Sequence, residues 1–281
     1  MTVSTLHPRW RRALGGVAEH WNQIGRQTQF YAQTVKGIGD AVLRYQSELI
    51  RLVAQMSLGS GALAVIGGTI VIVAFLTFSA GSLIAIQGYT QLQEVGVDAL
   101  AGFTSAFLNV RLVGPLVAGI GLAATIGAGA TAQLGAMRIS EEIDALEVMG
   151  IRSVAYLAST RVVGGVIVVI PLYCVAVLMA FLSTRIGDTL IFGQSVGVYD
   201  HYFNTFLNPV DLIYSFVQAI SMAVVVMLVH VYYGYNASGG PAGVGEAVGR
   251  AVRTSLVAAV FVTLFVSLAL YGRSGGLNLS G

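Results

Sequence analysis

Long apolar runs that contain no charged residue dominate the chain. A helix needs about 20 apolar residues to cross the hydrocarbon core of a bilayer. None of the runs alternates between apolar and polar residues, which indicates helices rather than strands. The runs predict five transmembrane helices, over about 62–86, 112–137, 162–184, 212–233 and 254–272.

A different pattern precedes the first run. Apolar residues recur in residues 31–56 with steps that alternate between four and three, so that they share one face of a helix. This predicts an amphipathic helix over 31–58 that lies in the membrane interface, and a short soluble helix packed on a partner is the alternative. The apolar stripe consists of Tyr31, Val35, Ile38, Val42, Tyr45, Leu49, Leu52 and Met56.

Composition agrees with the pattern. Hydrophobic residues make up 56% of the 281 residues and charged residues only 10%, against roughly 25% charged in a soluble domain. This excludes an ordinary soluble enzyme, a nucleic-acid-binding domain and a disordered protein. We therefore expect an all-α integral membrane protein that crosses the membrane several times.

The placement of basic residues predicts the orientation. If the N-terminus is cytoplasmic, 12 of the 15 lysines and arginines lie on the inner side, as the positive-inside rule requires. Residues 1–30 are then a cytoplasmic segment, which lacks the apolar core of a signal peptide. Residues 274–281 are an outer C-terminal tail, and the chain is a multi-pass protein of the inner (plasma) membrane.

Several kinds of chemistry have no support in the sequence. The chain has one lysine, Lys36, and the glycine-rich stretch 239–245 is followed by Glu246 rather than by the lysine of a phosphate-binding loop. We expect no enzymatic activity and no cofactor on this chain. The predicted spans contain no Asp or Glu, which argues against an ion-coupled carrier. The four histidines lack metal-ligand spacing, so no metal site is expected, and His230 is interpreted as an interfacial or pore-lining polar group.

The second predicted span carries small residues at four-residue spacing. Such residues let neighbouring helix backbones approach closely. We expect this helix at the centre of the bundle or at an interface between subunits, the alternative being a chance pattern in a glycine-rich chain. The residues singled out for helix packing are Gly119, Ala123, Gly127 and Gly135.

A short acidic segment follows that span. Ser140 is predicted to cap its helix at the N-terminus, and Gly150 to end it in the left-handed conformation. One face is predicted to be apolar, with acids mostly opposite, and Glu142 falls at the margin, where a partner arginine is expected. An ordinary solvated connecting helix is the alternative. The apolar face comprises Ile139, Ile143, Leu146 and Met149, and the candidate partners of Glu142 are Arg138, Arg152 and Arg161.

This segment also carries a family resemblance. The run 132–150 resembles the signature of the MlaE/YrbE permease family, and 243–252 resembles that family's second cytoplasmic loop. The resemblance covers roughly residues 30–272 and implies a permease domain over 59–273. It also implies that the acidic segment is a cytoplasmic coupling helix between the second and third spans, which docks on an ATPase. The residues concerned are Glu141, Glu142, Ile143, Asp144, Ala145, Leu146, Glu147, Met149 and Gly150.

The resemblance implies a function as well. The family supplies membrane subunits of ABC transporters that move lipids together with MCE proteins on the outer side. The segment 89–97 and the arginine-rich usage are similar to the actinobacterial YrbE branch, B-type. We therefore expect a paired second permease, a separate ATPase dimer that binds ATP and Mg, and uptake of a fatty acid, a mycolic-type lipid or a sterol. An ion-coupled carrier and a non-transporting scaffold for MCE proteins are the alternatives.

Overall fold

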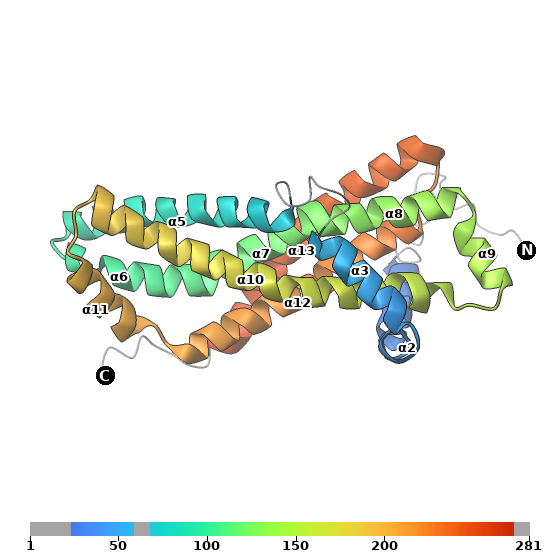
Figure 1. Ribbon diagram of the computed structural model, residues 1–281, viewed down its shortest axis with the longest axis horizontal. Helices are drawn as coiled ribbons and strands as arrows, with labels where there is room; N and C mark the ends of the chain where they lie inside the picture. Colours follow the sequence, from blue (N-terminus) through green and yellow to red (C-terminus); the bar gives the residue numbers. More distant parts are fainter. Residues whose placement is uncertain (1–23, 59–67, 273–281) are drawn as a thin grey trace, which may run out of the picture.

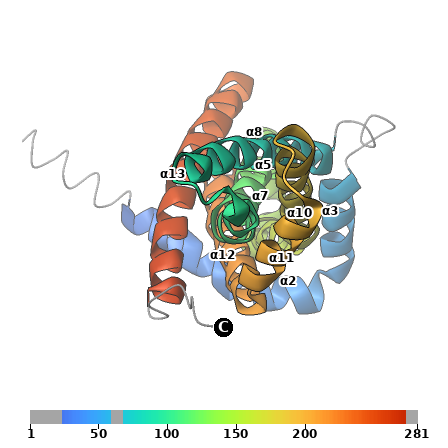
Figure 2. The same ribbon diagram turned by 90° about the vertical axis from the view of Figure 1, so that its left-hand side faces the viewer.

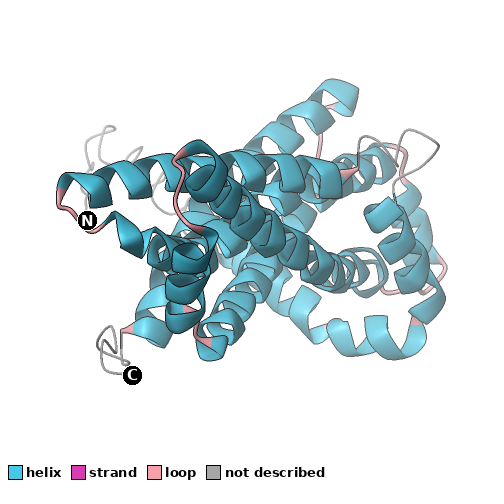
Figure 3. Ribbon diagram, turned by 60° about the vertical axis from the view of Figure 1, so that its left-hand side comes forward, coloured by secondary structure: helices cyan, strands magenta, loops and turns pink. Residues whose placement is uncertain are grey.

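The computed structural model describes residues 24–58 and 68–272. Within these ranges the chain consists of helices and loops, without a strand (Figure 3). Five of the helical segments are long and apolar enough to cross a membrane, which confirms the all-α class and the predicted number of spans. They are Thr69–Glu94, Asp98–Ile139, Val154–Ile191, Pro209–Tyr235 and Gly240–Tyr271.

Some of these segments are built from several elements, because turns of π-helix interrupt the α-helices. In chain order the elements after residue 68 are α5 (Thr69–Glu94), η1 (Asp98–Leu100), α6 (Ala101–Thr104), η2 (Ser105–Val113), α7 (Gly114–Leu122), η3 (Ala123–Gly127), α8 (Ala128–Ile139), α9 (Glu142–Val148), η4 (Val154–Ser159), α10 (Thr160–Ile186), η5 (Gly187–Ile191), α11 (Val196–Phe206), α12 (Pro209–Tyr235) and α13 (Gly240–Tyr271). Of the η elements, η1 is a 3₁₀ turn and the other four are π-helical.

The helices extend beyond the apolar runs that predicted them. The second segment begins at Asp98 rather than near 112, and the third continues to Ile191 rather than 184. A charged residue need not end a membrane helix when it forms an ion pair. Arg111 lies inside the second segment and pairs with Asp211 at 2.8 Å. The statement that no Asp or Glu lies in a span is therefore wrong for the full helices, since Asp188 lies inside the third. The start of the first predicted span, 62–67, lies outside the described residues.

The molecule is an elongated bundle with α9 at one end and α6 and α11 at the other (Figure 1). The helix α10 packs against α5 and α12, and α12 packs against α13. Viewed along the bundle, α13 and α3 lie on opposite sides (Figure 2). The outer helices bury little of their surface within this chain: 22% of the most apolar window of α5 is buried and 11% of that of α13. Their free faces are apolar and suit lipid or another membrane subunit.

The predicted amphipathic helix is not continuous. Helical residues 24–36 are followed by α2 (Ile38–Arg44) and α3 (Gln46–Leu58), with breaks at Gly37 and Tyr45. A Cβ at Gly37 would lie 2.5 Å from Ser159 Oγ and 3.1 Å from Ala155 Cα, so the bare backbone is needed for the close contact with η4.

The buried face of this N-terminal region also differs from the predicted stripe. Thr34 and Ala41 are fully buried, whereas Val35 and Val42 of the stripe are 49% and 41% exposed. The face that packs on the bundle therefore includes residues off the predicted stripe, and the stripe itself stays a prediction. The position of these helices in the membrane interface stays a prediction.

Candidate functional site

The acidic segment forms a short helix, α9, that projects from one end of the bundle between α8 and η4 (Figure 1). Its C-terminal end is as predicted: Gly150 has φ 77°. The Gly150 N–H donates to the Glu147 carbonyl at 2.9 Å and the Ile151 N–H to the Leu146 carbonyl at 3.0 Å. This pair of backbone hydrogen bonds is a Schellman motif, which ends a helix sharply.

The N-terminal end differs from the prediction. The residue before α9 is Glu141, which has φ 61° and makes no capping hydrogen bond with its side chain. The Ser140 hydroxyl instead donates back to the Ala136 carbonyl at 3.0 Å and contacts Glu142 Oε1 at 2.9 Å. The prediction of Ser140 as the N-cap is wrong because α8 continues to Ile139, which leaves Ser140 at the end of α8.

The two faces of α9 are only partly as predicted. Ile143 is fully buried and Leu146 packs half-buried against the core. Met149 is 66% exposed and Ile139 38% exposed, so these two do not belong to the buried face, while Val148 is 89% exposed. The tip of α9 thus presents apolar side chains to the outside. Around them stand the exposed acids Glu141, Glu142, Asp144 and Glu147.

None of the three candidate arginines pairs with Glu142. Arg138 pairs with Asp144 at 2.6 Å, Arg152 pairs with Asp40 at 2.8 Å, and Arg161 donates to the Leu157 carbonyl at 3.0 Å. The prediction of an arginine partner is wrong because Glu142 is exposed to solvent and needs no buried counter-charge.

The base of α9 is joined to two long helical segments. Ser153, just before η4, donates to Glu147 Oε1 at 2.5 Å, and the Tyr235 hydroxyl at the end of α12 reaches the same oxygen at 3.2 Å. The hydroxyls of Ser153 and Tyr235 lie 2.7 Å apart. These hydrogen bonds connect α9 to the third and fourth segments.

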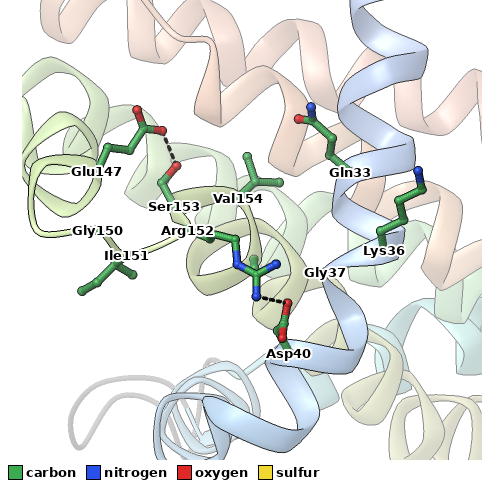
Figure 4. A pocket seen from close by; sticks show the side chains of 11 residues that line it. Gln33, Lys36, Gly37, Asp40, Glu147, Gly150, Ile151, Arg152, Ser153 and Val154 are labelled. Carbon is green, nitrogen blue, oxygen red and sulfur yellow. Dashed lines mark hydrogen bonds and ion pairs between the residues drawn. The ribbon is translucent and has the colours of Figure 1, made fainter.

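A cavity of about 540 Å³ lies beside this base, between the N-terminal helices and the loop that leaves α9 (Figure 4). Gln33, Lys36 and Asp40 line it on one side, and Glu147 and Arg152 on the other. The ion pair between Arg152 and Asp40 crosses it (Figure 4). No sequence pattern predicts this pairing, because the two residues lie in different predicted elements.

Four small residues of the second segment, the small-residue file, face the inside of the bundle: Gly119, Ala123, Gly127 and Gly135. Gly119 contacts the side chain of Met222 of α12, and Ala123 is fully buried. A Cβ at Gly127 would lie 2.6 Å from the His230 ring, and a Cβ at Gly135 would lie 2.8 Å from Val244 Cγ1. The file thus lets α7, η3 and α8 approach α12 and the start of α13 of the same chain.

His230 is part of this contact rather than an interfacial or pore-lining group. It is fully buried. Its Nδ1 lies 2.8 Å from Thr131 Oγ1 of α8 and its Nε2 lies 3.1 Å from Ser255 Oγ of α13. One imidazole therefore joins three helices, which the sequence could not show because its partners are single hydroxyls far apart in the chain.

Comparison with known proteins places the chain in a family. A family model described as "Permease MlaE" matches residues 59–269. The chain belongs to the MlaE permease family. The match begins after α3 and spans the five long helices, the small-residue file and α9. With five apolar helices and this family, the chain is a multi-pass membrane permease.

Individual relatives carry related names. A "Probable ABC transporter permease protein" of Rickettsia bellii is 29% identical over 248 residues, which is 84% of this chain and 92% of the relative. The "Intermembrane phospholipid transport system permease protein MlaE" of Haemophilus influenzae is 24% identical over 68% of this chain and 74% of the relative. TRIGALACTOSYLDIACYLGLYCEROL 1 of Arabidopsis thaliana is 26% identical over 71% of this chain and 57% of the relative.

Proposed function

We propose that this chain is the membrane subunit of an ABC transporter that moves lipids, and that α9 is the helix on which a separate ATPase subunit docks. The proposal rests on the structure of α9. Its tip exposes acidic and apolar side chains, and its base is hydrogen-bonded to two long helical segments. The names of the Rickettsia and Haemophilus relatives support an ABC transporter and a phospholipid-like substrate.

The tip of α9 has the composition of a docking surface. Val148 and Met149 expose large apolar side chains, which would fill a groove on the partner. The surrounding acids would meet basic residues of the partner, since complementary charge orients a complex and excludes wrong partners.

The base of α9 offers a route for transmitting movement. ATP binding and hydrolysis on the partner would push or release α9, and Glu147 would pass the displacement through Ser153 and Tyr235 to η4 and α12. The small-residue file would let α7 and η3 move on α12, because Gly119 and Gly127 place no side chain of their own against Met222 and His230.

Several finer parts of the proposal rest on the family resemblance. We propose a second permease as partner, MCE proteins on the outer side, import as the direction, and a fatty acid, a mycolic-type lipid or a sterol as cargo. The B-type, actinobacterial assignment and the cytoplasmic N-terminus belong to the same proposal. The wide free face of α13 suits a membrane partner; it carries Val257, Val260, Phe261, Leu264, Phe265 and Leu268.

A matched pair of substitutions tests the docking role. Val148→Asp places a charge on the tip of α9, where the native side chain is 89% exposed, and Val95→Asp places it at the opposite end of the bundle, where the side chain is 71% exposed. We expect V148D to lose the co-purifying ATPase and V95D to keep it, at equal membrane abundance. Full retention of the ATPase by V148D would refute the docking role of α9.

A further inference from the structure

A buried polar cluster lies at the end of the bundle opposite α9, where α10, η5, η2 and α11 meet (Figure 1). Its side chains are completely or almost completely excluded from solvent. Two of them, Asn109 and Asp188, lie in the π-helical segments η2 and η5, and π-helical turns occur frequently at functional sites. The cluster consists of Ser105, Asn109, Thr184, Asp188 and Tyr199.

Hydrogen bonds hold most of this cluster together. Asn109 Nδ2 donates to Thr184 Oγ1 at 2.9 Å and to Ser105 Oγ at 3.2 Å, and the Tyr199 hydroxyl donates to Ser105 Oγ at 2.8 Å. These bonds join η2 to α10 and to α11. Thr184 lies one helical turn before Asp188, so the hydrogen-bonded side chain of Thr184 and the carboxyl group of Asp188 are on the same side of the helix.

The remaining polar atoms are acceptors without a donor. Both carboxyl oxygens of Asp188 and Asn109 Oδ1 are buried and receive no hydrogen bond from the residues that the structure describes. The same holds for Oε1 of the neighbouring Gln194, whose backbone N–H donates to the Asp188 carbonyl at 3.0 Å. Asp188 is also the only fully buried acid in the described part of the chain. An isolated carboxylate in such surroundings is strongly disfavoured. A water molecule could donate hydrogen bonds, but it would leave the negative charge uncompensated.

The charged and titratable groups around Asp188 do not compensate it. Arg185 of the same helix pairs with Asp200 of α11 at 2.8 Å, at the exposed surface. Tyr199 of α11 and Tyr89 of α5 lie within electrostatic range of Asp188. Burial raises the pKa of Tyr199 to about 12, so this phenol stays neutral. None of these groups therefore supplies an unpaired positive charge to Asp188.

We propose that the buried cluster around Asp188 binds one monovalent cation, a proton or Na⁺. One carboxylate among neutral oxygens matches a single positive charge, whereas Mg²⁺ and Ca²⁺ sites usually hold more carboxylates or water. The bound cation neutralises Asp188 and stabilises the packing of α11 on η2 and η5. This site is independent of the docking surface on α9.

The first test measures stability of the wild-type full-length chain in detergent, from the loss of its monodisperse size-exclusion peak on heating. A Na⁺ site predicts a melting temperature that rises when choline is replaced by Na⁺ at constant ionic strength. A proton site predicts no response to Na⁺. The folded chain then binds the proton more tightly than the unfolded chain, so the unfolding constant rises by up to about tenfold per pH unit as pH increases.

A matched pair of variants shows whether Asp188 causes the dependence of stability on Na⁺ or on pH. Asp188→Asn keeps the shape of the side chain and removes the charge, so it should abolish the dependence on Na⁺ or on pH. Asp200→Asn removes a neighbouring carboxylate whose side chain is 41% exposed, and it should keep the wild-type response. A wild type that responds to neither Na⁺ nor pH, or a response that D188N retains, would overturn the proposal.

A spectroscopic measurement keeps the proposal testable if D188N does not fold. Exposed carboxyl groups are ionised at neutral pH, so the C=O stretch of a protonated acid in the infrared spectrum would report on Asp188. If the site holds a proton, the wild type shows this band in the absence of Na⁺. If the site holds Na⁺, adding Na⁺ either removes the band or, where no band is present, raises the melting temperature. Absence of the band together with no effect of Na⁺ on stability contradicts both forms.

Discussion

Acidic groups are exposed to solvent at one end of the bundle and buried at the other. At the α9 end, acids stand in solvent beside exposed apolar side chains, with Val148 89% exposed. At the opposite end, Asp188 and Asn109 are fully buried among helices. An exposed acid needs no partner within the chain and is available to bind one outside, whereas a buried acid must be neutralised where it is. The first arrangement suits docking, and the second suits a cation held inside the fold.

The largest effect is expected in the accessibility of the two ends of the bundle, which we predict to lie on opposite sides of the membrane. The chain has a single cysteine, Cys174, so Cys174→Ser gives a cysteine-free background. Cysteines placed at Val148 and Val95, both exposed, should react with an impermeant thiol reagent from opposite sides, position 148 from the cytoplasm. The background variant should not react. Labelling of both positions from one side would contradict the arrangement.

The next largest effect is expected inside the bundle. Gly127→Leu should reduce transport and assembly, because the new side chain collides with His230, and overpacking typically costs about 1–3 kcal/mol. Gly129→Leu is the matched control, since a Cβ there meets nothing within 4 Å. Lipid uptake and the melting temperature, normalised to membrane abundance, compare the two. Equal mild effects would mean that the small-residue file is not a helix contact.

A smaller effect is expected at the base of α9. Ser153→Ala removes the hydroxyl that bonds both Glu147 and Tyr235, at a cost of about 1 kcal/mol. The ATPase should still bind, because the tip of α9 is unchanged, but less lipid should move per ATP hydrolysed. The measurement is the ratio of lipid transport to ATP hydrolysis in reconstituted vesicles. An unchanged ratio would exclude Ser153 from the route between α9 and α12.

The smallest effect is expected at the ion pair that crosses the cavity. Arg152→Gln breaks the contact with Asp40, but the Arg152 side chain is 65% exposed, and exposed ion pairs contribute about 0–1 kcal/mol. A double-mutant cycle with Asp40→Asn, read from melting temperatures, should give a coupling energy in this range. A much larger coupling would show that the N-terminal helices are held to α9 by more than surface charge.

The features that the sequence predicted well are local ones. Charge-free runs identify membrane helices because the bilayer core excludes charge, and Gly150 identifies the end of α9 because few other residues adopt its φ of 77°. The acids of α9 were identified for the same reason, since a short segment that is rich in charge cannot continue an apolar span.

The features that it missed depend on contacts between distant segments. Gly37 breaks the N-terminal helix because Ser159 and Ala155 come close to it, which no periodicity reveals. Asp188 lies past the end of an apolar run, so that only the continuation of the helix to Ile191 shows that it is buried. Ser140 has the residue type of an N-cap, and only the path of α8 shows that it is not one.

Photo-cross-linking in the assembled transporter shows whether the ATPase docks on α9. A photoreactive amino acid at position 148 reports what lies against the tip of α9, and the same residue at position 95 is the control at the other end. We predict that position 148 cross-links to a nucleotide-binding subunit and that position 95 does not. Cross-links from position 148 that reach only lipid or another membrane subunit would contradict docking of the ATPase on α9.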